Sequence, residues 1–116
     1  NMANTFKVIT KAGVTSADVI YTVAGSTTTV ILGLIIGNTT SSSINATVTL
    51  GTDTTNRSGA NNETNQDVEL LTTTPIPGNS TLELLAGNKV VMETTDTLSV
   101  TGSGAVDVAL SVMEIT

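Results

Sequence analysis

Residues 28–38 read TTVILGLIIGN, and this stretch decides the fold class that the sequence predicts. It is dominated by β-branched and aliphatic residues, and it carries no charge. In an extended strand the even-numbered residues point to one side and the odd-numbered ones, among them Ile31 and Ile35, point to the other. Because a strand that is apolar on both faces is covered on both sides, we expect a buried strand at Thr28–Asn38. Its glycines leave space for another backbone or subunit, or for a bend.

Shorter stretches with a two-residue period recur along the chain, separated by turn formers about every 8–12 residues. Ile44–Leu50 alternates between aliphatic and polar side chains, which is typical of an antiparallel strand with one wet face. Threonine supplies 24 of the 116 residues and favours strands over helices. The sequence therefore predicts an all-β antiparallel sandwich, jelly-roll-like, with eight to nine short strands. The expected strands are residues 6–10, 18–23, 28–38, 44–50, 68–73, 81–85, 89–93, 97–101 and 106–115.

The chain length suits one domain, for which we expect residues 2–116. Asn1 precedes Met2 and is interpreted as a residue left by cloning. Residues 51–66 are rich in turn formers and are expected to form an exposed loop. Loops of this length are usually functional or mobile, so Asn61, Asn62 and Glu63 are candidates for contacting a partner.

The residues that most catalytic mechanisms need are missing. The chain has no His and no Cys, and its ten carboxylates are spread along the sequence. General-base and nucleophilic catalysis draw mainly on His, Cys or paired carboxylates, so we do not expect an enzyme. The oxygen-bearing residues of the 51–66 loop match no calcium-loop spacing, and no cofactor or metal is expected.

Composition also argues against nucleic-acid and membrane partners. The net charge is −6, and the four Lys and Arg residues are dispersed. Phosphate binding needs clustered cations, and single-strand binding needs aromatic residues, of which there are two. The longest apolar run, Val30–Ile36, is far shorter than the ~20 residues that span a bilayer. Residues 2–7 do not resemble a signal peptide.

Several short motifs resemble those of small virion structural proteins of tailed, especially marine, bacteriophages. They are MANTFK at Met2–Lys7, YTV at Tyr21–Val23, PIPG at Pro75–Gly78, GNKVV at Gly87–Val91 and DVALSVMEI at Asp107–Ile115. These motifs are structural rather than catalytic. The resemblance implies a sandwich or jelly-roll domain used in head decoration, neck, tail or fibre assembly. It also implies a Gly-Asp pair where this chain has Thr95-Asp96.

On this basis the expected function is capsid decoration or cementing on the exterior of a phage particle assembled in the host cytoplasm. The chain would act by self-association, as a trimer or ring, and by packing on other virion proteins. Apolar residues on second strand faces are the candidate interface, and intramolecular cover of those residues is the alternative. The candidate interface residues are Ile31, Ile35, Leu71 and Leu85.

Two other functions stay open at this point. One is a tail or fibre component, including a receptor- or glycan-binding module that uses the 51–66 loop. The other is a non-viral structural module, such as a surface-layer or pilus-like domain. The lack of a recognisable signal peptide argues against this second function.

Overall fold

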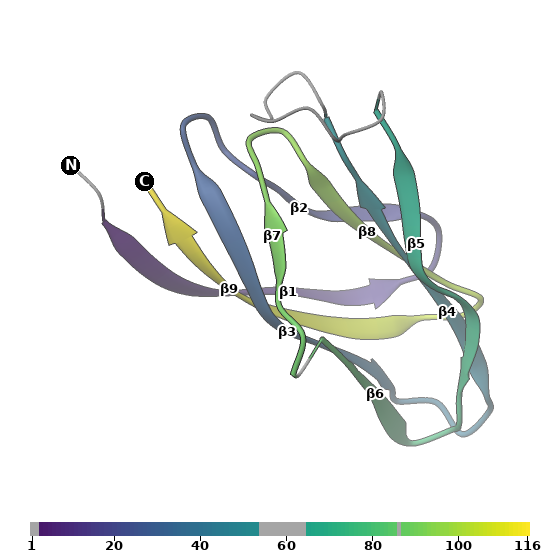
Figure 1. Ribbon diagram of the computed structural model, residues 1–116. Helices are drawn as coiled ribbons and strands as arrows, with labels where there is room; N and C mark the ends of the chain where they lie inside the picture. The colour runs from purple at the N-terminus through teal and green to yellow at the C-terminus, as the bar shows by residue number, and fades with distance from the viewer. Residues whose placement is uncertain (1–2, 54–64, 86) are drawn as a thin grey trace.

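The computed structural model describes residues 3–53, 65–85 and 87–116, which form nine antiparallel strands in two packed sheets (Figure 1). The predicted all-β sandwich is confirmed. The strands are β1 Asn4–Val14, β2 Asp18–Thr22, β3 Thr28–Asn38, β4 Ile44–Gly51, β5 Asp67–Ile76, β6 Ser80–Leu84, β7 Val90–Met92, β8 Thr97–Gly102 and β9 Val106–Ile115.

The strand order is that of a jelly roll. Sheet A has the order β1-β9-β3-β6, with β7 also paired to β3, and sheet B has the order β2-β8-β4-β5. The pairs are nested around β4 and β5: β3 pairs with β6 and β7, β2 with β8, and β1 with β9. Nested pairing of this kind is a long hairpin rolled into two sheets, which is the jelly-roll form of the sandwich.

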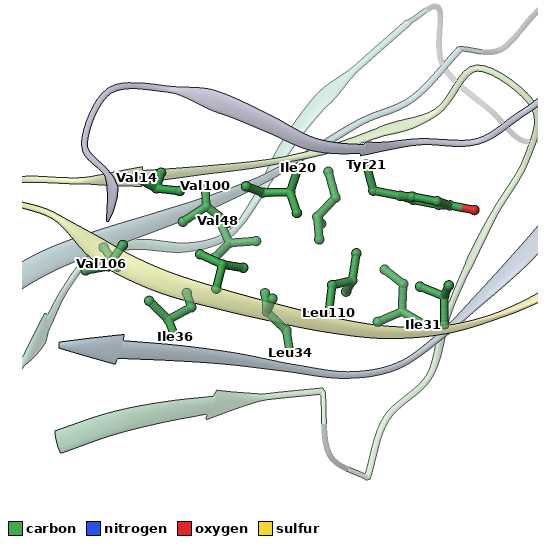
Figure 2. Close-up of a cluster of buried hydrophobic side chains, with 14 of the residues drawn as sticks. Val14, Ile20, Tyr21, Ile31, Leu34, Ile36, Val48, Val100, Val106 and Leu110 are labelled. Atoms are coloured by element: carbon green, nitrogen blue, oxygen red, sulfur yellow. The ribbon is translucent and has the colours of Figure 1, made fainter. Parts of the chain in front are cut away.

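The core lies between the two sheets and is built by the two-residue period of their strands (Figure 2). In β9 strict alternation of the sequence puts Val106, Val108, Leu110 and Val112 on one face, and all four are buried. Sheet B supplies Val48 and Val100 from two neighbouring strands, and both are fully buried. Aliphatic side chains fill most of this core because the chain has one Phe and one Tyr.

A bulge in β3 changes which residues of Thr28–Asn38 face the core, compared with the strict alternation that the sequence predicts. The pairing of β3 with β9 shifts register between Ile31 and Gly33, so the strand changes its buried side at Leu32. Ile31 lies before the shift, and Leu34 and Ile36 lie after it, yet all three are buried in the core. The prediction that Ile31 belongs to an interface is therefore wrong, because its side chain is fully enclosed between the sheets.

A second bulge changes the phase of β2. Strict alternation places Val19 and Tyr21 on the same face, but the pairing with β8 shifts between them. As a result Ile20 and Tyr21 are both buried, and Val19 is 51% exposed on the outer face of sheet B.

The first strand is longer than predicted and forms an edge of sheet A. The sequence predicts a break at Lys11, Ala12 and Gly13, but β1 continues through an irregularity to Val14. Gly13 has φ +70, a conformation that side-chain-bearing residues rarely adopt. Its backbone N–H donates to Asp107 Oδ1 at 3.0 Å, which keeps the end of β1 attached to β9.

Buried Asn38 closes one end of the sandwich through hydrogen bonds to two turns. Its Nδ2 donates to the carbonyls of Ser42 at 2.7 Å and Ile76 at 2.9 Å, and its Oδ1 accepts from the N–H of Thr40 at 3.0 Å. The turns are in close contact, because a Cβ at Gly78 would clash with the carbonyl oxygen of Ser41. This end is therefore held by a side chain bonded to backbone.

At the other end, buried Asp96 plays the corresponding role. Its Oδ1 accepts from the backbone N–H of Asp53 at 2.8 Å, and its Oδ2 accepts from that of Glu93 at 2.9 Å. Thr95, beside it, has φ +70, which explains why glycine would suit this position. The Asp96 carboxylate thus connects the β7–β8 turn to the end of β4.

Candidate interaction surface

The outer face of sheet A presents three rows of side chains that run across the strands, and we call it the apolar face. Residues paired between neighbouring strands share a face, so the register gives the rows directly. The first row, which we call the ridge, consists of large apolar side chains. The ridge is Phe6, Met113, Val30 and Val91; the middle row is Val8, Ser111 and Gly33; the third row is Thr10, Ala109, Ile35 and Glu83.

This face is unusually apolar for an exposed surface. Phe6 is 70% exposed, Val8 63%, and Ile35 and Val91 about half exposed. They are four of the six large apolar side chains that are exposed in the described residues. Among the three rows one side chain is charged, Glu83 at the border. Contiguous exposed apolar surface of this kind marks interaction sites in soluble folds.

A hollow lies beyond the middle row, on the side opposite the ridge. It has a volume of about 380 Å³ and is lined by small or apolar residues and two charged ones. They are Thr10, Lys11, Ala12, Ile35, Gly37, Asp107, Val108 and Ala109. The hollow exists because the residues between β1 and Ile35 are small. A second, smaller hollow of about 240 Å³ borders Gly33 and Ile35 on the β6 side. The face therefore has a raised end and a recessed end.

The outer face of sheet B differs in chemistry. Its central strands pair Thr47 with Thr101 and Thr49 with Ser99. Glu69 of β5 lies beside Thr49, so a charge borders this face. Val19 and Val68, the other two exposed large apolar residues of the described part, lie on the edge strands β2 and β5. Sheet B thus presents a hydroxyl-rich surface.

Tyr21 joins the two sheets at the end of the sandwich where the ridge lies. Its hydroxyl bonds to Thr29 Oγ1 at 2.7 Å and donates to Glu114 Oε2 at 2.5 Å. Glu114 also pairs with Lys7 Nζ at 2.7 Å. Burial, and then the bond to Glu114, raises the pKa of Tyr21 to about 12. The Lys7 ammonium, followed by the Tyr21 hydroxyl, lowers the pKa of Glu114.

The structure separates the four candidate interface residues. Ile35 lies on the apolar face, where it borders the hollow. Ile31 is in the core, and Leu71 and Leu85 are partly buried and pack against the core from its margin. For Leu71 and Leu85 this arrangement agrees with intramolecular cover, the alternative raised by the sequence.

The other candidate residues, Asn61, Asn62 and Glu63, lie outside the described residues. Within the described part, the expected 51–66 loop begins later than predicted, because Gly51 pairs with Asp67 as the last residue of β4.

The candidate interface residues predicted from the sequence did not include Phe6, Val8 and Val91. Phe6 and Val8 carry a usable signal, since they alternate with Lys7 and Ile9 in a strand. Val91 carries no such signal in the sequence, because it lies beside Val30 only through the pairing of β7 with β3.

The described residues offer no obvious metal site or membrane span. No group of three or more Asp and Glu side chains among them is arranged to hold a metal ion. In the same residues no helix is long and apolar enough to cross a bilayer.

Comparisons with known proteins identify a fold rather than a family. No family model matches the chain, and no curated protein matches it. A solved structure of a Bacillus endospore appendage, from a novel family of disulfide-linked pili, matches with a TM-score of 0.52. The two chains are 12% identical, and the match covers 98% of this chain and 86% of the other. At this identity the likeness shows a shared fold.

This finding corrects the expected function. The matching structure is a bacterial structural protein unrelated to phage, and no virion protein was found. The expectation of capsid decoration, with a tail or fibre component as alternative, is therefore wrong. The resemblance of short motifs to phage proteins stays a prediction, because neither the family models nor the curated proteins test it.

Proposed function

We propose that this chain is a non-catalytic structural protein that assembles with copies of itself through the apolar face. The observation that carries the proposal is the gathering of Phe6, Val8, Ile35 and Val91 on one face of one sheet. The same sandwich has a second outer face made of Thr and Ser, so the fold itself does not require apolar residues outside.

The fold match supports a structural role. The matching protein belongs to a family of disulfide-linked pili, and a pilus is a filament built from many protein copies. This chain has no cysteine, so it makes no disulfides. Its assembly must therefore rely on non-covalent surface, and the apolar face supplies that surface.

The residue inventory supports the absence of catalysis. The chain has no His or Cys, and the described carboxylates form no cluster of three. Glu83 and Asp107 border the two hollows of sheet A, but they lie in different hollows. A pair of carboxylates acting on one substrate would have to share a cleft.

A matched pair of charge substitutions tests the proposal. Val91 on the apolar face and Val19 on sheet B are both 51% exposed, so aspartate at either position costs the monomer little. Light scattering should give the wild-type chain a mass above the 11.8 kDa of one copy. Val91→Asp should weaken assembly about 100-fold, because the charge is buried without a partner. Val19→Asp should leave assembly unchanged.

Two results would overturn the proposal. One is a wild-type chain that stays monomeric at millimolar concentration. The other is equal loss of assembly in both variants, which would show a general effect of added charge rather than a specific face.

A further inference from the structure

We infer that the apolar face binds the same face of a second copy, related by a two-fold axis that runs along the middle row. This inference rests on the proposed function and specifies its geometry. The axis lies between the two faces and passes over Val8, Ser111 and Gly33. Rotation about it brings the ridge of each copy over the third row of the other.

The shape of the face supports this arrangement. The ridge and the hollow lie on opposite sides of the middle row, so one rotation brings both ridges onto both hollows. Phe6 of one copy then meets Thr10 of the other, and Met113 meets Ala109. Val91 meets the exposed Glu83 at the border of the face. A cavity of ~150 Å³ is enough to bind benzene. The hollow, at about 380 Å³, has room for the phenyl ring of Phe6 beside Met113.

The size of the face fits a dimer. The whole outer face of sheet A, of which the three rows are the central part, has strands of 10 or 11 residues at ~3.4 Å per residue, with β6 and β7 sharing the fourth strand position. With strands spaced ~4.8 Å, this outer face measures roughly 650 Å². Two such faces bury about 1,300 Å², within the roughly 1,200–2,000 Å² of specific interfaces. The pair would form a closed dimer, since a two-fold contact uses the same surface on both copies.

The charges of the face favour a copy over a charged partner. This face carries Glu83 at the border of the third row and Asp107 one row further along β9, and Lys11 also lines the hollow, so charges of both signs are few and lie at the margin. Strong electrostatic recognition of a nucleic acid or a basic peptide needs more charge than that. The net charge of −6 opposes dimerisation at long range, so added salt should strengthen the dimer by screening.

A cysteine at Ser111 tests the position of the axis. Ser111 is exposed on β9, the inner neighbour of edge strand β1, and faces its own copy across the proposed axis. Because the chain has no cysteine and packed sheets lie ~10 Å apart, Ser111→Cys should cross-link to a dimer with a short bis-maleimide. Ser99→Cys is the matched control, since Ser99 holds the equivalent place on β8 of sheet B. It should stay uncross-linked.

Gly33→Val tests the same surface without relying on cross-linking. A Cβ at Gly33 meets no atom within 4 Å, and its φ is not in the left-handed region, so the monomer should fold with an unchanged or higher Tm. The added side chains would collide across the axis, and dimerisation should weaken at least tenfold. Gly25, also unobstructed but in the β2–β3 turn, gives the control Gly25→Ala.

The outcomes separate the inference from the proposed function. A monomeric wild type overturns both. If wild-type chains assemble and Val91→Asp prevents it, but Ser111→Cys does not cross-link, the two-fold geometry is wrong and the proposed function stands. Species that grow beyond a dimer through this face also overturn the geometry, because a closed contact stops at two. Edge-to-edge pairing of β1 strands would keep the two Ser111 residues about three strand spacings, ~14 Å, apart, farther than the ~10 Å between two packed faces.

Discussion

The two outer faces of this sandwich cover the same core with opposite chemistry. On sheet B, Thr47, Thr49 and Thr101 occupy central positions, whereas on sheet A these positions belong to Val30, Ile35 and Met113. Both sets suit strands, because threonine, valine and isoleucine share the branched Cβ that fits a pleated surface. Strand formation therefore does not explain the aliphatic residues of sheet A. This difference is the basis for the proposal that these residues act in contacts between copies.

The largest predicted effect tests whether both faces belong to one rigid body. Leu110 of β9 is fully buried against both sheets, directly between the outward-facing Ala109 and Ser111. Leu110→Ala should lower the free energy of unfolding by about 3 kcal/mol, the usual cost of a cavity in a packed core. Urea denaturation would measure it. A single transition should persist, and two separate transitions would show that the sheets unfold independently and cannot be compared as two sides of one body.

A smaller effect is expected from the hydroxyl that links the sheets. Tyr21→Phe removes the bonds to Thr29 and Glu114 and should cost about 1–2 kcal/mol. The pKa of Tyr21 is about 12 in the folded chain, whereas the ordinary pKa of tyrosine, expected in the unfolded chain, is 10.0. The neutral hydroxyl therefore makes its full contribution to the free energy of unfolding below pH 10. Its contribution is lost as the pH rises from 10 through 12.

Ultraviolet titration checks this second prediction directly, since the chain has one tyrosine. The folded chain should ionise near pH 12 and the urea-unfolded chain near pH 10. In Tyr21→Phe the fall in stability between pH 10 and 12 should be reduced. A native titration near pH 10 would mean that the hydroxyl is accessible to water and does not join the sheets.

The smallest expected effect tests whether an apolar face is enough for assembly, or whether the ridge and hollow of sheet A are also needed. The double substitution Thr49→Val with Thr101→Val makes the centre of the sheet B face apolar and keeps the Thr47 hydroxyl that accepts from the Thr73 N–H. It should change the free energy of unfolding by no more than about 0.5 kcal/mol, because both sites are on the surface. The mass by light scattering should equal that of the wild type, since sheet B lacks a ridge and hollow. New, larger assemblies would show that apolar area alone is enough.

The sequence predicted where most strands lie better than which way their residues point. Thr28–Asn38 and Val106–Ile115 have the predicted bounds, because turn formers flank a clear two-residue period. The bulges at Leu32 and Ile20 were not predictable, since a bulge inserts one residue without a distinctive local composition. A bulge gives the residues before it and the residues after it opposite burial phases. Ile31, before the bulge, is therefore buried together with Leu34 and Ile36 after it.

The apolar face was partly within reach of the sequence. Strict alternation in Val106–Ile115 places Asp107, Ala109, Ser111 and Met113 on the face opposite the core, and the structure has them there. Ile35 was likewise predicted on a second strand face. Phe6 and Val91 join it only because β1 and β7 lie in the same sheet as β3 and β9. These strands are distant in sequence, and local pattern carries no information on which distant strands pair. The function drawn from short motifs failed for a related reason, since those motifs describe turns and strands that unrelated sandwiches share.

The hydrogen bonds of Asn38 have a practical consequence for protein engineering. Apart from the Thr40 hydroxyl, its partners are backbone groups of the β3–β4 and β5–β6 connections. Backbone groups are present whatever the side chain, so neighbouring turn positions such as Ser41 and Ser43 should accept varied sequences if Asn38 and Gly78 are kept. That end of the molecule is therefore a natural place to display randomised loops, on a scaffold that contains no cysteine to interfere with chemical labelling.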